Sequence, residues 1–202
     1  MKTVILTGGM GSGKSAVCRY LSSRGVPVYD SDARTKSLYD RDPSLVLKME
    51  QVLKVSLRDA EGRLDRRRLA GVIFPDPVAR SLVESVVHPA VLEDFKRWKR
   101  WHRPRGWTYG SVPFVVLESA IILSCPVFDG VGDKVVFVDA PEDVRVLRSV
   151  ERDHSDPAAA LRRIRQQSFD LSRVDAVIRN AGSLEELSAE TDRVFLNLFL
   201  YL

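Results

Sequence analysis

Cysteines and long apolar runs are scarce in this sequence of 202 residues. Its two cysteines, Cys18 and Cys125, have no paired spacing, which excludes a small disulfide-stapled fold and predicts reduced thiols in a cytoplasmic protein. No run of about 18 apolar residues occurs, so no membrane-spanning helix is predicted. The apolar stretch Val4-Ile5-Leu6 is short and runs into glycines, so we expect no export signal.

Neither the charge nor the hydrophobic content is extreme. Hydrophobic residues make up 45% of the chain and charged residues 29%, which excludes a long disordered tail, a collagen-like repeat and a coiled coil. The length fits one domain with an inserted subdomain. The net charge of +4 fits a polyanionic ligand, either nucleic acid or the phosphates of a nucleotide.

The first motif of the chain follows a β-rich apolar run at residues 2–7. Residues 8–15 read GGMGSGKS and fill the pattern G-x-x-x-x-G-K-[ST]. Glycines let successive N–H groups face inward around phosphate oxygens, and a helix starting near Gly13 adds its positive end. Lys14 can reach the β- and γ-phosphates, and the Ser15 hydroxyl can ligate Mg²⁺. The alternative is a plain glycine turn, but we predict a nucleoside triphosphate site that includes Gly9, Met10, Gly11, Ser12, Gly13, Lys14 and Ser15.

A pair of aspartates follows the next predicted strand, Val26–Tyr29. In an extended segment residues i and i+2 share a face, so Asp30 and Asp32 are predicted to project together at the carboxyl end of that strand. Such carboxylates can orient an acceptor hydroxyl and help to hold Mg²⁺. The alternative is an N-cap for a helix that begins at Ala33. We favour a functional role for Asp32.

Residues 33–109 change to a helical pattern and predict an insertion between strands of the sheet. Apolar residues recur at helical spacing in Ser44–Val55, Arg66–Ile73, Val78–Val87 and Pro89–His102. The basic stretch Lys96–Arg103 is interpreted as a helix with a solvated charged face, with a phosphate-binding face or a nucleic-acid patch as alternatives. His88, next to Pro89, is either a capping or packed residue or a functional one.

Two later apolar runs, Val112–Leu117 and Lys134–Val138, predict buried parallel strands. A carboxylate follows each of them. Asp139 stands before a proline and a new helix, which favours capping. Glu118 is a candidate for contact with the acceptor or with Mg²⁺-bound water at the carboxyl edge of the sheet.

Arginines accumulate in the segment after Asp139. Arg145, Arg148 and Arg152 are spaced three and four apart, which places them on one face of a helix. Asp156 and Pro157 predict the start of a second basic helix that runs through Gln167 and carries Arg162, Arg163 and Arg165. Two hinged basic helices are expected of a lid that closes over phosphates, and the alternative is salt bridging with neighbouring acids.

The rest of the chain predicts a last strand at Val174–Ile178, a turn at Asn180–Gly182 and a closing helix at Leu184–Leu202. Several segments in this order, over nearly the whole chain, resemble the dephospho-CoA kinase family: GGMGSGKS, YDSD, LDRRRLAGVIF, HPAV, VVLESAIIL, LRSVERD and DAVIRNAGSLEEL. The resemblance implies ATP-dependent phosphorylation of the ribose 3′-hydroxyl of dephospho-CoA, the last step of coenzyme A synthesis.

The resemblance also implies an α/β fold, the three-layer α/β/α arrangement of P-loop NTPases with a five-stranded parallel sheet. The core would comprise residues 1–32, 110–150 and 173–202, the helical CoA-binding insertion residues 33–109, and the short lid residues 151–172. It further implies these site residues: Lys14 and Ser15 for ATP and Mg²⁺, Asp32 as the catalytic residue that also contacts Mg²⁺, Arg66, His88 and Glu118 for the substrate, Arg148 and Arg152 near the phosphates, and Asn180 and Gly182 against adenine.

Two alternatives to this kinase remain open from the sequence. One is another small-molecule P-loop kinase, acting on a nucleoside or a nucleotide. The other is a nucleic-acid-binding module that uses the stretch Trp98–Arg103, which would bind mainly through phosphate contacts. The leading interpretation predicts a cytoplasmic monomer that binds ATP, Mg²⁺ and dephospho-CoA, and neither nucleic acid nor a membrane.

Overall fold

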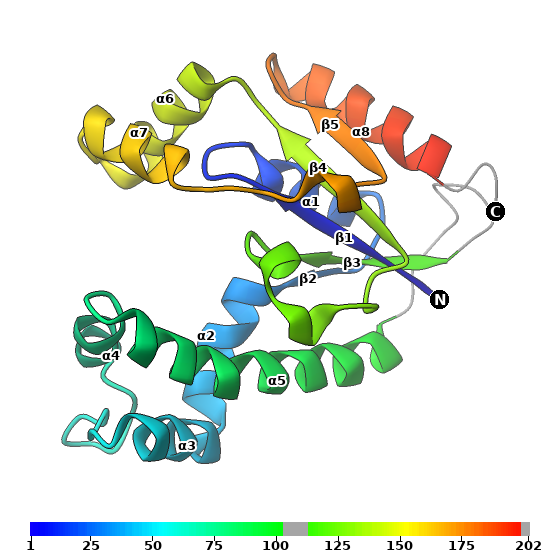
Figure 1. Ribbon diagram of the computed structural model, residues 1–202. Coiled ribbons are helices and arrows are strands. Elements are labelled where there is room, and N and C mark those ends of the chain that lie inside the picture. The colour runs from blue at the N-terminus through cyan, green and yellow to red at the C-terminus, as the bar shows by residue number, and fades with distance from the viewer. Residues whose placement is uncertain (103–112, 199–202) are drawn as a thin grey trace. The chain divides into compact units, whose positions relative to one another are not determined.

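A five-stranded sheet organises the fold of the protein, of which the computed structural model describes residues 1–102 and 113–198 (Figure 1). The strands are parallel and their order is β2-β3-β1-β4-β5. Their bounds are β1 Lys2–Gly8, β2 Val28–Asp30, β3 Phe114–Glu118, β4 Lys134–Asp139 and β5 Ala176–Arg179. The α/β class and the five-stranded parallel sheet predicted above are therefore confirmed.

The helices occupy the segments between the strands. Their bounds are α1 Lys14–Ser23, α2 Ser31–Arg41, α3 Pro43–Leu53, α4 Arg66–Ile73, α5 Pro77–Trp101, α6 Glu142–Asp153, α7 Pro157–Arg165 and α8 Leu184–Leu198. Short 3₁₀ turns lie at Ile122–Ser124, Pro126–Phe128 and Leu171–Arg173. Within the described ranges, no helix has the length and apolar character needed to cross a membrane.

The chain divides into two compact units. The first comprises Met1–Tyr29 and Lys99–Leu202, and the second comprises Asp30–Trp98. The sheet and helices α1, α6, α7 and α8 belong to the first unit, whereas α2, α3, α4 and most of α5 belong to the second.

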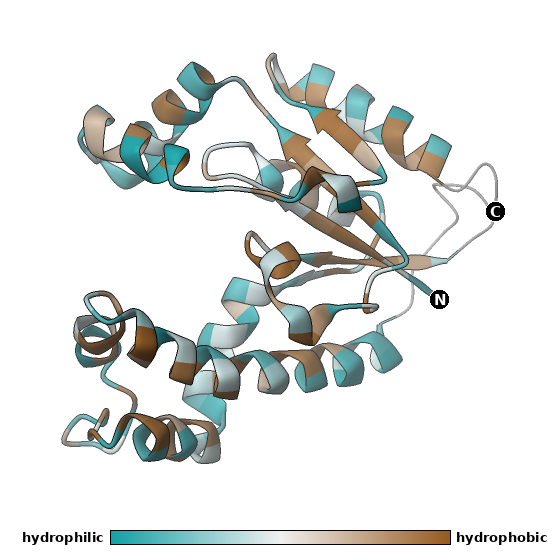
Figure 2. Ribbon diagram, in the orientation of Figure 1, coloured by the Kyte–Doolittle hydropathy of each residue, from teal (hydrophilic) through white to brown (hydrophobic). Residues whose placement is uncertain are grey.

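Apolar strand residues form the core of the first unit. Val4 and Leu6 of β1 and Val136 and Val138 of β4 are fully buried, as expected of parallel strands that are covered on both faces. Helices α1 and α8 contribute Val17, Leu21, Leu187 and Phe195 to the same cluster. The hydropathy colouring of Figure 2 shows this concentration as largely brown central strands.

The register of the sheet brings several loops to one edge. Leu6 of β1 lies opposite Glu118 of β3, and Gly8 lies opposite Val138 of β4. Asp139, the last residue of β4, lies opposite Arg179 of β5. Because parallel strands end at the same edge, the segments that follow β1, β3, β4 and β5 all leave the sheet there.

The second unit confirms one predicted helix and corrects another. Helix α4 has the predicted bounds, Arg66–Ile73, and Asp65 caps it by accepting the N–H groups of Arg67 and Arg68, each at 3.0 Å. The two helices predicted on either side of His88 are a single helix, α5. Pro89 removes one backbone donor, but the helix continues because buried Val83, Val87, Val91 and Phe95 line one side at intervals of four.

The predicted arrangement of Asp30 and Asp32 was wrong. Asp30 ends β2 and caps α2, because its Oδ1 accepts the N–H of Ala33 at 2.9 Å. Asp32 lies in the first turn of that helix, so the two carboxylates do not share an extended face. The Asx cap, weighed as the alternative, describes Asp30.

Asp139 also departs from its prediction. Helix α6 begins at Glu142 with Pro141 at its N-cap and has no side-chain cap, so Asp139 ends β4 without capping the helix. One residue, Ala140, separates Asp139 from the cap position. Several other predicted elements change only in their bounds; for example, the strand predicted at Val26–Tyr29 is β2, Val28–Asp30, and the helix predicted to run through Gln167 is α7, which ends at Arg165. Helix α8 is described to Leu198, and residues 103–112 and 199–202 of the predicted segments lie outside the described residues.

Candidate active site

The phosphate loop, residues 8–15, joins β1 to α1 at the carboxyl edge of the sheet. Gly13 caps α1 in the left-handed region, with φ of 96°, and a Cβ there would overlap the amide nitrogen of Asn180. In the described part of the chain, the N–H groups of Gly11 and Gly13 donate to no other residue. The loop therefore presents unpaired donors next to the positive end of α1, which is an arrangement that binds anions.

Lys14 lies along the same loop. Its Nζ donates to the carbonyl oxygen of Gly8 at 2.7 Å and to that of Gly9 at 3.3 Å. These bonds hold the ammonium group at the loop, where a bound phosphate would meet it. Ser15 is exposed in the first turn of α1, so its hydroxyl is accessible to a ligand.

Asn180 connects the phosphate loop to helix α6. Its buried side chain donates from Nδ2 to the carbonyl oxygen of Ser12 at 2.8 Å. Arg148 of α6 then donates to the backbone oxygen of Asn180 at 3.2 Å and to its Oδ1 at 3.3 Å. The structure thus brings together three of the predicted site positions: the loop, the turn after β5 and Arg148.

Arg145 makes the direct contact between α6 and the loop, and it was not among the predicted site residues. Its Nε donates to the carbonyl oxygen of Met10 at 2.9 Å, and its Nη2 donates to Oε1 of Gln167 at 3.1 Å. Burial lowers the pKa of the Arg145 guanidinium, while the carboxylates of Asp139 and Glu142 act in the opposite direction. The spacing that places Arg145 on the same helix face as Arg148 could have indicated that Arg145 also belongs to the site. Nothing in the sequence indicated a role for Gln167.

Arg152 contacts an acidic neighbour and not the turn after β5 in the hydrogen bonds described here. It pairs with the adjacent Asp153, from Nε at 2.7 Å and from Nη2 at 2.9 Å. This pairing raises the pKa of Arg152 and lowers the pKa of Asp153. On α7, Arg165 pairs with Glu142 at 2.8 Å. Salt bridging with neighbouring acids, the alternative to phosphate binding, therefore describes part of the arginine cluster.

The remaining predicted residue of the first unit is Glu118. It is the last residue of β3 and is half-buried at the edge where the phosphate loop begins. Its position agrees with the expected carboxyl edge.

Three predicted residues belong to the second unit. Asp32 is exposed in the first turn of α2. Arg66, at the start of α4, donates from Nη2 to Asp40 at 2.8 Å and to the carbonyl oxygen of Lys36 at 3.2 Å. His88 is half-buried in the middle of α5, and burial lowers its pKa while the carboxylate of Glu84 opposes the shift.

The basic stretch at the end of α5 has the predicted amphipathic character. Phe95 is buried and stacks on the half-buried Trp98, with ring centroids 6.1 Å apart, while Lys96 and Arg97 are exposed. Lys96 pairs with Glu93 at 2.7 Å. His102 follows the end of the helix and is exposed, and Arg103 lies outside the described residues.

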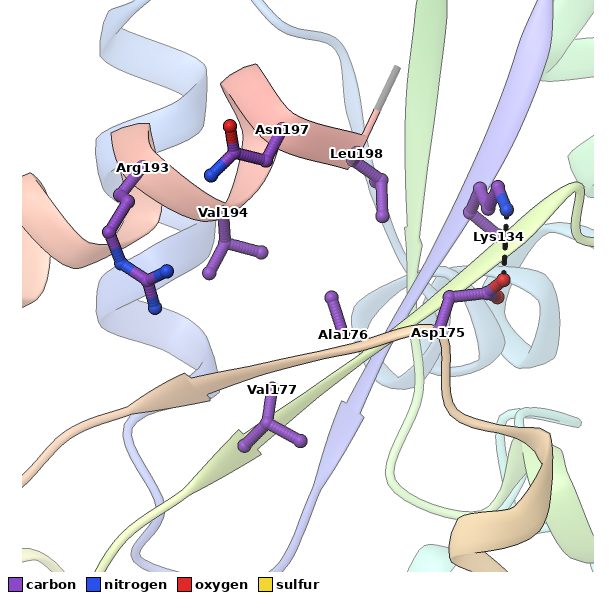
Figure 3. A pocket seen from close by; sticks show the side chains of 8 residues that line it. All are labelled: Lys134, Asp175, Ala176, Val177, Arg193, Val194, Asn197 and Leu198. Atoms are coloured by element: carbon purple, nitrogen blue, oxygen red, sulfur yellow. Dashed lines mark hydrogen bonds and ion pairs between the residues drawn. The ribbon is translucent and has the colours of Figure 1, made fainter. Parts of the chain in front are cut away.

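Two cavities border β5 at opposite ends. One of about 780 Å³ lies at the carboxyl end, beside the turn after the strand, and is lined by Val177, Arg179, Ala181, Gly182, Glu186, Glu190 and Arg193. The other, of about 440 Å³, is lined in part by Lys134 and Asp175, whose ion pair of 3.0 Å is drawn in Figure 3. Because those two residues stand at the amino ends of β4 and β5, this second cavity is not part of the phosphate-loop site.

Comparisons with known proteins agree on one family. A family model for dephospho-CoA kinase matches residues 2–186. Curated dephospho-CoA kinases are 36% identical in Porphyromonas gingivalis, over 90% of this chain and 87% of that protein, and 35% identical in Corynebacterium diphtheriae, over 94% and 95%.

Solved structures agree at the level of the fold. The TT1252 protein of Thermus thermophilus has a TM-score of 0.75 and 30% identity, over 98% of this chain and 97% of that one. A shikimate kinase from Acinetobacter baumannii, in complex with shikimate, has a TM-score of 0.51 and 17% identity, over 99% and 96%, and so shares the fold alone. With a phosphate loop at its sheet edge and close relatives along nearly its whole length, the chain belongs to the dephospho-CoA kinase family and uses ATP to phosphorylate dephospho-CoA, the last step of coenzyme A synthesis.

Proposed function

We propose that the phosphates of ATP bind in the phosphate loop of this kinase and that its adenine lies against the turn Asn180–Gly182. One observation carries the proposal: the unpaired N–H groups of Gly11 and Gly13, the ammonium of Lys14 and the guanidinium of Arg148 gather around one loop. These are the groups that bind and neutralise a polyphosphate. The large cavity beside Ala181 and Gly182 leaves room next to the turn.

Mg²⁺ would be held by the Ser15 hydroxyl and the Asp32 carboxylate, together with phosphate oxygens of ATP. Both side chains are exposed and offer oxygen atoms, which Mg²⁺ prefers. Residues 1–102 and 113–198 contain no cluster of three or more His, Cys, Asp or Glu side chains suited to a metal. That agrees with an ion bound largely by substrate phosphates and water. When bound, Mg²⁺ neutralises charge on the phosphates of ATP.

Asp32 would act on the acceptor hydroxyl of dephospho-CoA. Because Asp30 caps α2, the carboxylate of Asp32 is not needed for the cap and stays exposed at the start of the helix. A carboxylate at the acceptor orients the hydroxyl and accepts its proton late in phosphoryl transfer. We assign Arg66, His88 and Glu118 to substrate binding, and the helical insertion as a whole to the CoA moiety.

Arg148 and Arg152 would stabilise charge on the transferred phosphoryl group, with residues 151–172 acting as the lid. Guanidinium groups suit this role because they bind phosphate oxygens in a fork. Arg148 is adjacent to the loop through Asn180, whereas Arg152 would have to leave Asp153 when the lid closes.

The enzyme is further proposed to work as a monomer in the cytoplasm. All proposed site residues are supplied by one chain, and no disulfide joins Cys18 and Cys125, which suits a reducing compartment. Light scattering of the purified protein tests the first statement, and a mass equal to two chains would contradict it.

The replacement Lys14→Ala tests the ATP site. Lys14 is a half-buried residue of the phosphate loop and is not part of the buried apolar core, so its loss should remove charge from the phosphates with little effect on that core. We expect turnover of dephospho-CoA to be nearly abolished and the melting temperature to stay within a degree or two of wild type. Wild-type turnover in the variant would place ATP elsewhere.

The pair Asp32→Asn and Asp30→Asn tests the acceptor side. Asparagine caps helices as well as aspartate does, so neither replacement disturbs α2. We expect Asp32→Asn to lower single-turnover phosphoryl transfer by roughly 10²- to 10⁴-fold, with little change in ATP affinity, and Asp30→Asn to have a much smaller effect. A larger loss in Asp30→Asn would reverse the two roles.

A further inference from the structure

The backbone of Met10, in the phosphate loop, is bound by a side chain from α6 and by one from the segment that follows α7. Its N–H donates to Oε1 of Gln167 at 2.8 Å, and its carbonyl oxygen accepts from Nε of Arg145 at 2.9 Å. Arg145 also donates from Nη2 to the same Oε1 at 3.1 Å. Three hydrogen bonds therefore close a ring between Met10, Arg145 and Gln167, which we call the latch.

The latch lies at the base of the pair of helices α6 and α7, which pack side by side (Figure 1). Arg145 belongs to the first turns of α6, and Gln167 follows the end of α7 by two residues. The ion pair between Glu142 and Arg165, at 2.8 Å, joins the same two ends. The entry and the exit of the helix pair are thus tied to each other and, through the latch, to the phosphate loop.

The loop is shaped to receive Arg145. A Cβ at Gly9 would overlap Nη2 of Arg145 and come within 3.1 Å of Oε1 of Gln167. A Cβ at Gly11 would overlap the backbone oxygen of Arg145. A side chain at position 11 would push α6 away, and one at position 9 would displace the Arg145 guanidinium, so these glycines serve the approach of the helix and its arginine as well as that of a phosphate.

We propose that Gln167 is a positioning residue for ATP, and that it acts by holding Met10 and orienting Arg145 so that the phosphate loop keeps its binding shape. This rests on the ATP site proposed above. Without the Gln167 acceptor, the partly buried N–H of Met10 loses this hydrogen bond, and the Arg145 side chain keeps its bond to the Met10 carbonyl but loses its bond to Gln167. The loop then spends time in other shapes, and ATP must select the binding shape at a cost in affinity.

The experiment replaces Gln167 by methionine, which has similar length and no strong acceptor. The adjacent Gln166, whose side chain is exposed, provides the matched control Gln166→Met. We expect Gln167→Met to weaken ATP binding by about 3- to 10-fold, to leave the KM for dephospho-CoA unchanged and to speed amide exchange at Met10. Gln166→Met should behave as wild type in all three.

The variant Gln167→Glu separates positioning from general stability. A carboxylate can accept the two hydrogen bonds that the latch makes to position 167, so slow exchange at Met10 should return. Equal ATP affinity in Gln167→Met and Gln166→Met would overturn the proposal. So would a loss in Gln167→Met that appears equally in both KM values, with unchanged exchange at Met10.

Failure of the latch is distinguishable from failure of the ATP site. If Lys14→Ala abolishes turnover while Gln167→Met matches its control, only the latch is wrong. If Lys14→Ala keeps wild-type turnover, the ATP site itself is wrong, whatever Gln167→Met does.

Discussion

At the residue scale, the contacts of each arginine side chain show whether it lies next to the phosphate loop. Arg148 contacts Asn180 and through it the phosphate loop, whereas Arg152, with 62% of its side chain exposed, pairs with its neighbour Asp153. Sequence spacing placed both on one helix face and could not separate them, because the difference lies in what each side chain reaches across the fold.

This difference predicts unequal effects of truncation. Arg148→Ala should both raise the KM for ATP and lower kcat, because it also loosens Asn180 beside the loop. Arg152→Ala should lower kcat with little change in the KM for ATP, because it would meet the phosphates only after closure, and its exposed ion pair should cost less than about 1 kcal/mol of stability. Steady-state kinetics and melting curves of the two variants test this prediction. Near-normal turnover in both would show that neither arginine takes part in phosphoryl transfer.

The cap at Asp30 makes a prediction about stability alone. Asp30→Ala removes the acceptor for the N–H of Ala33 and should lower the free energy of unfolding by about 1 kcal/mol. Asp32→Ala should leave it nearly unchanged, because Asp32 does not cap the helix. Urea denaturation of both variants measures this, and equal losses would mean that the two aspartates share the cap.

His88 predicts a dependence of stability on pH. Burial lowers the pKa of its imidazole in the folded protein below the ordinary value of 6.5. The unfolded chain therefore takes up a proton that the folded protein resists, so stability is present above about pH 6.5 and is lost as the pH falls. The free energy of unfolding should fall more steeply from pH 8 to pH 5 in wild type than in His88→Gln. Parallel curves would show that His88 does not contribute.

At the scale of elements, an ion pair joins α2 to α5 within the second unit. Nε and Nη2 of Arg34 each donate to Asp94 at 2.8 Å, and the Asp94 side chain is only 10% exposed. Breaking such a pair leaves a nearly buried charge without its main partner.

The replacement Arg34→Met should therefore lower the free energy of unfolding by about 3 kcal/mol. The double variant Arg34→Met/Asp94→Leu should recover part of that loss, because it leaves no buried charge. Chemical denaturation of both proteins provides the test. A double variant less stable than the single one would show that Asp94 has a structural role beyond this pair.

Elements with local signals were predictable from the sequence, and those set by tertiary packing were not. Helix α4 was predicted with its bounds because Asp65 is a strong cap and the apolar spacing is regular. The proline at position 89 suggested a break in α5, yet burial along one side outweighs a single lost hydrogen bond. Asp30 and Asp32 were predicted to lie in one extended segment because the strand signal of Val26–Tyr29 precedes them, whereas β2 ends at Asp30 and α2 already starts at Ser31.

The candidate site also contains one part that the sequence predicts and one part that depends on the tertiary fold. The phosphate loop is a contiguous motif whose spacing alone implies its geometry, so it was visible in the sequence. The latch joins positions 10, 145 and 167, and no pattern in one sequence links a glutamine to a backbone group 157 positions away. The parallel pairing of β1 and β4 makes that contact possible, because Met10 follows β1 and both Arg145 and Gln167 lie in the segment that follows β4.

At the scale of the whole molecule, we expect this chain to transfer a phosphoryl group from ATP to dephospho-CoA and to no simpler acceptor. The direct measurement incubates the purified protein with Mg²⁺ and ATP and offers dephospho-CoA, a nucleoside or a nucleoside monophosphate in turn. We expect ADP and coenzyme A, phosphorylated at the ribose 3′-hydroxyl, from dephospho-CoA alone. Equal or faster phosphorylation of the nucleoside or the monophosphate would show that dephospho-CoA is not the preferred acceptor.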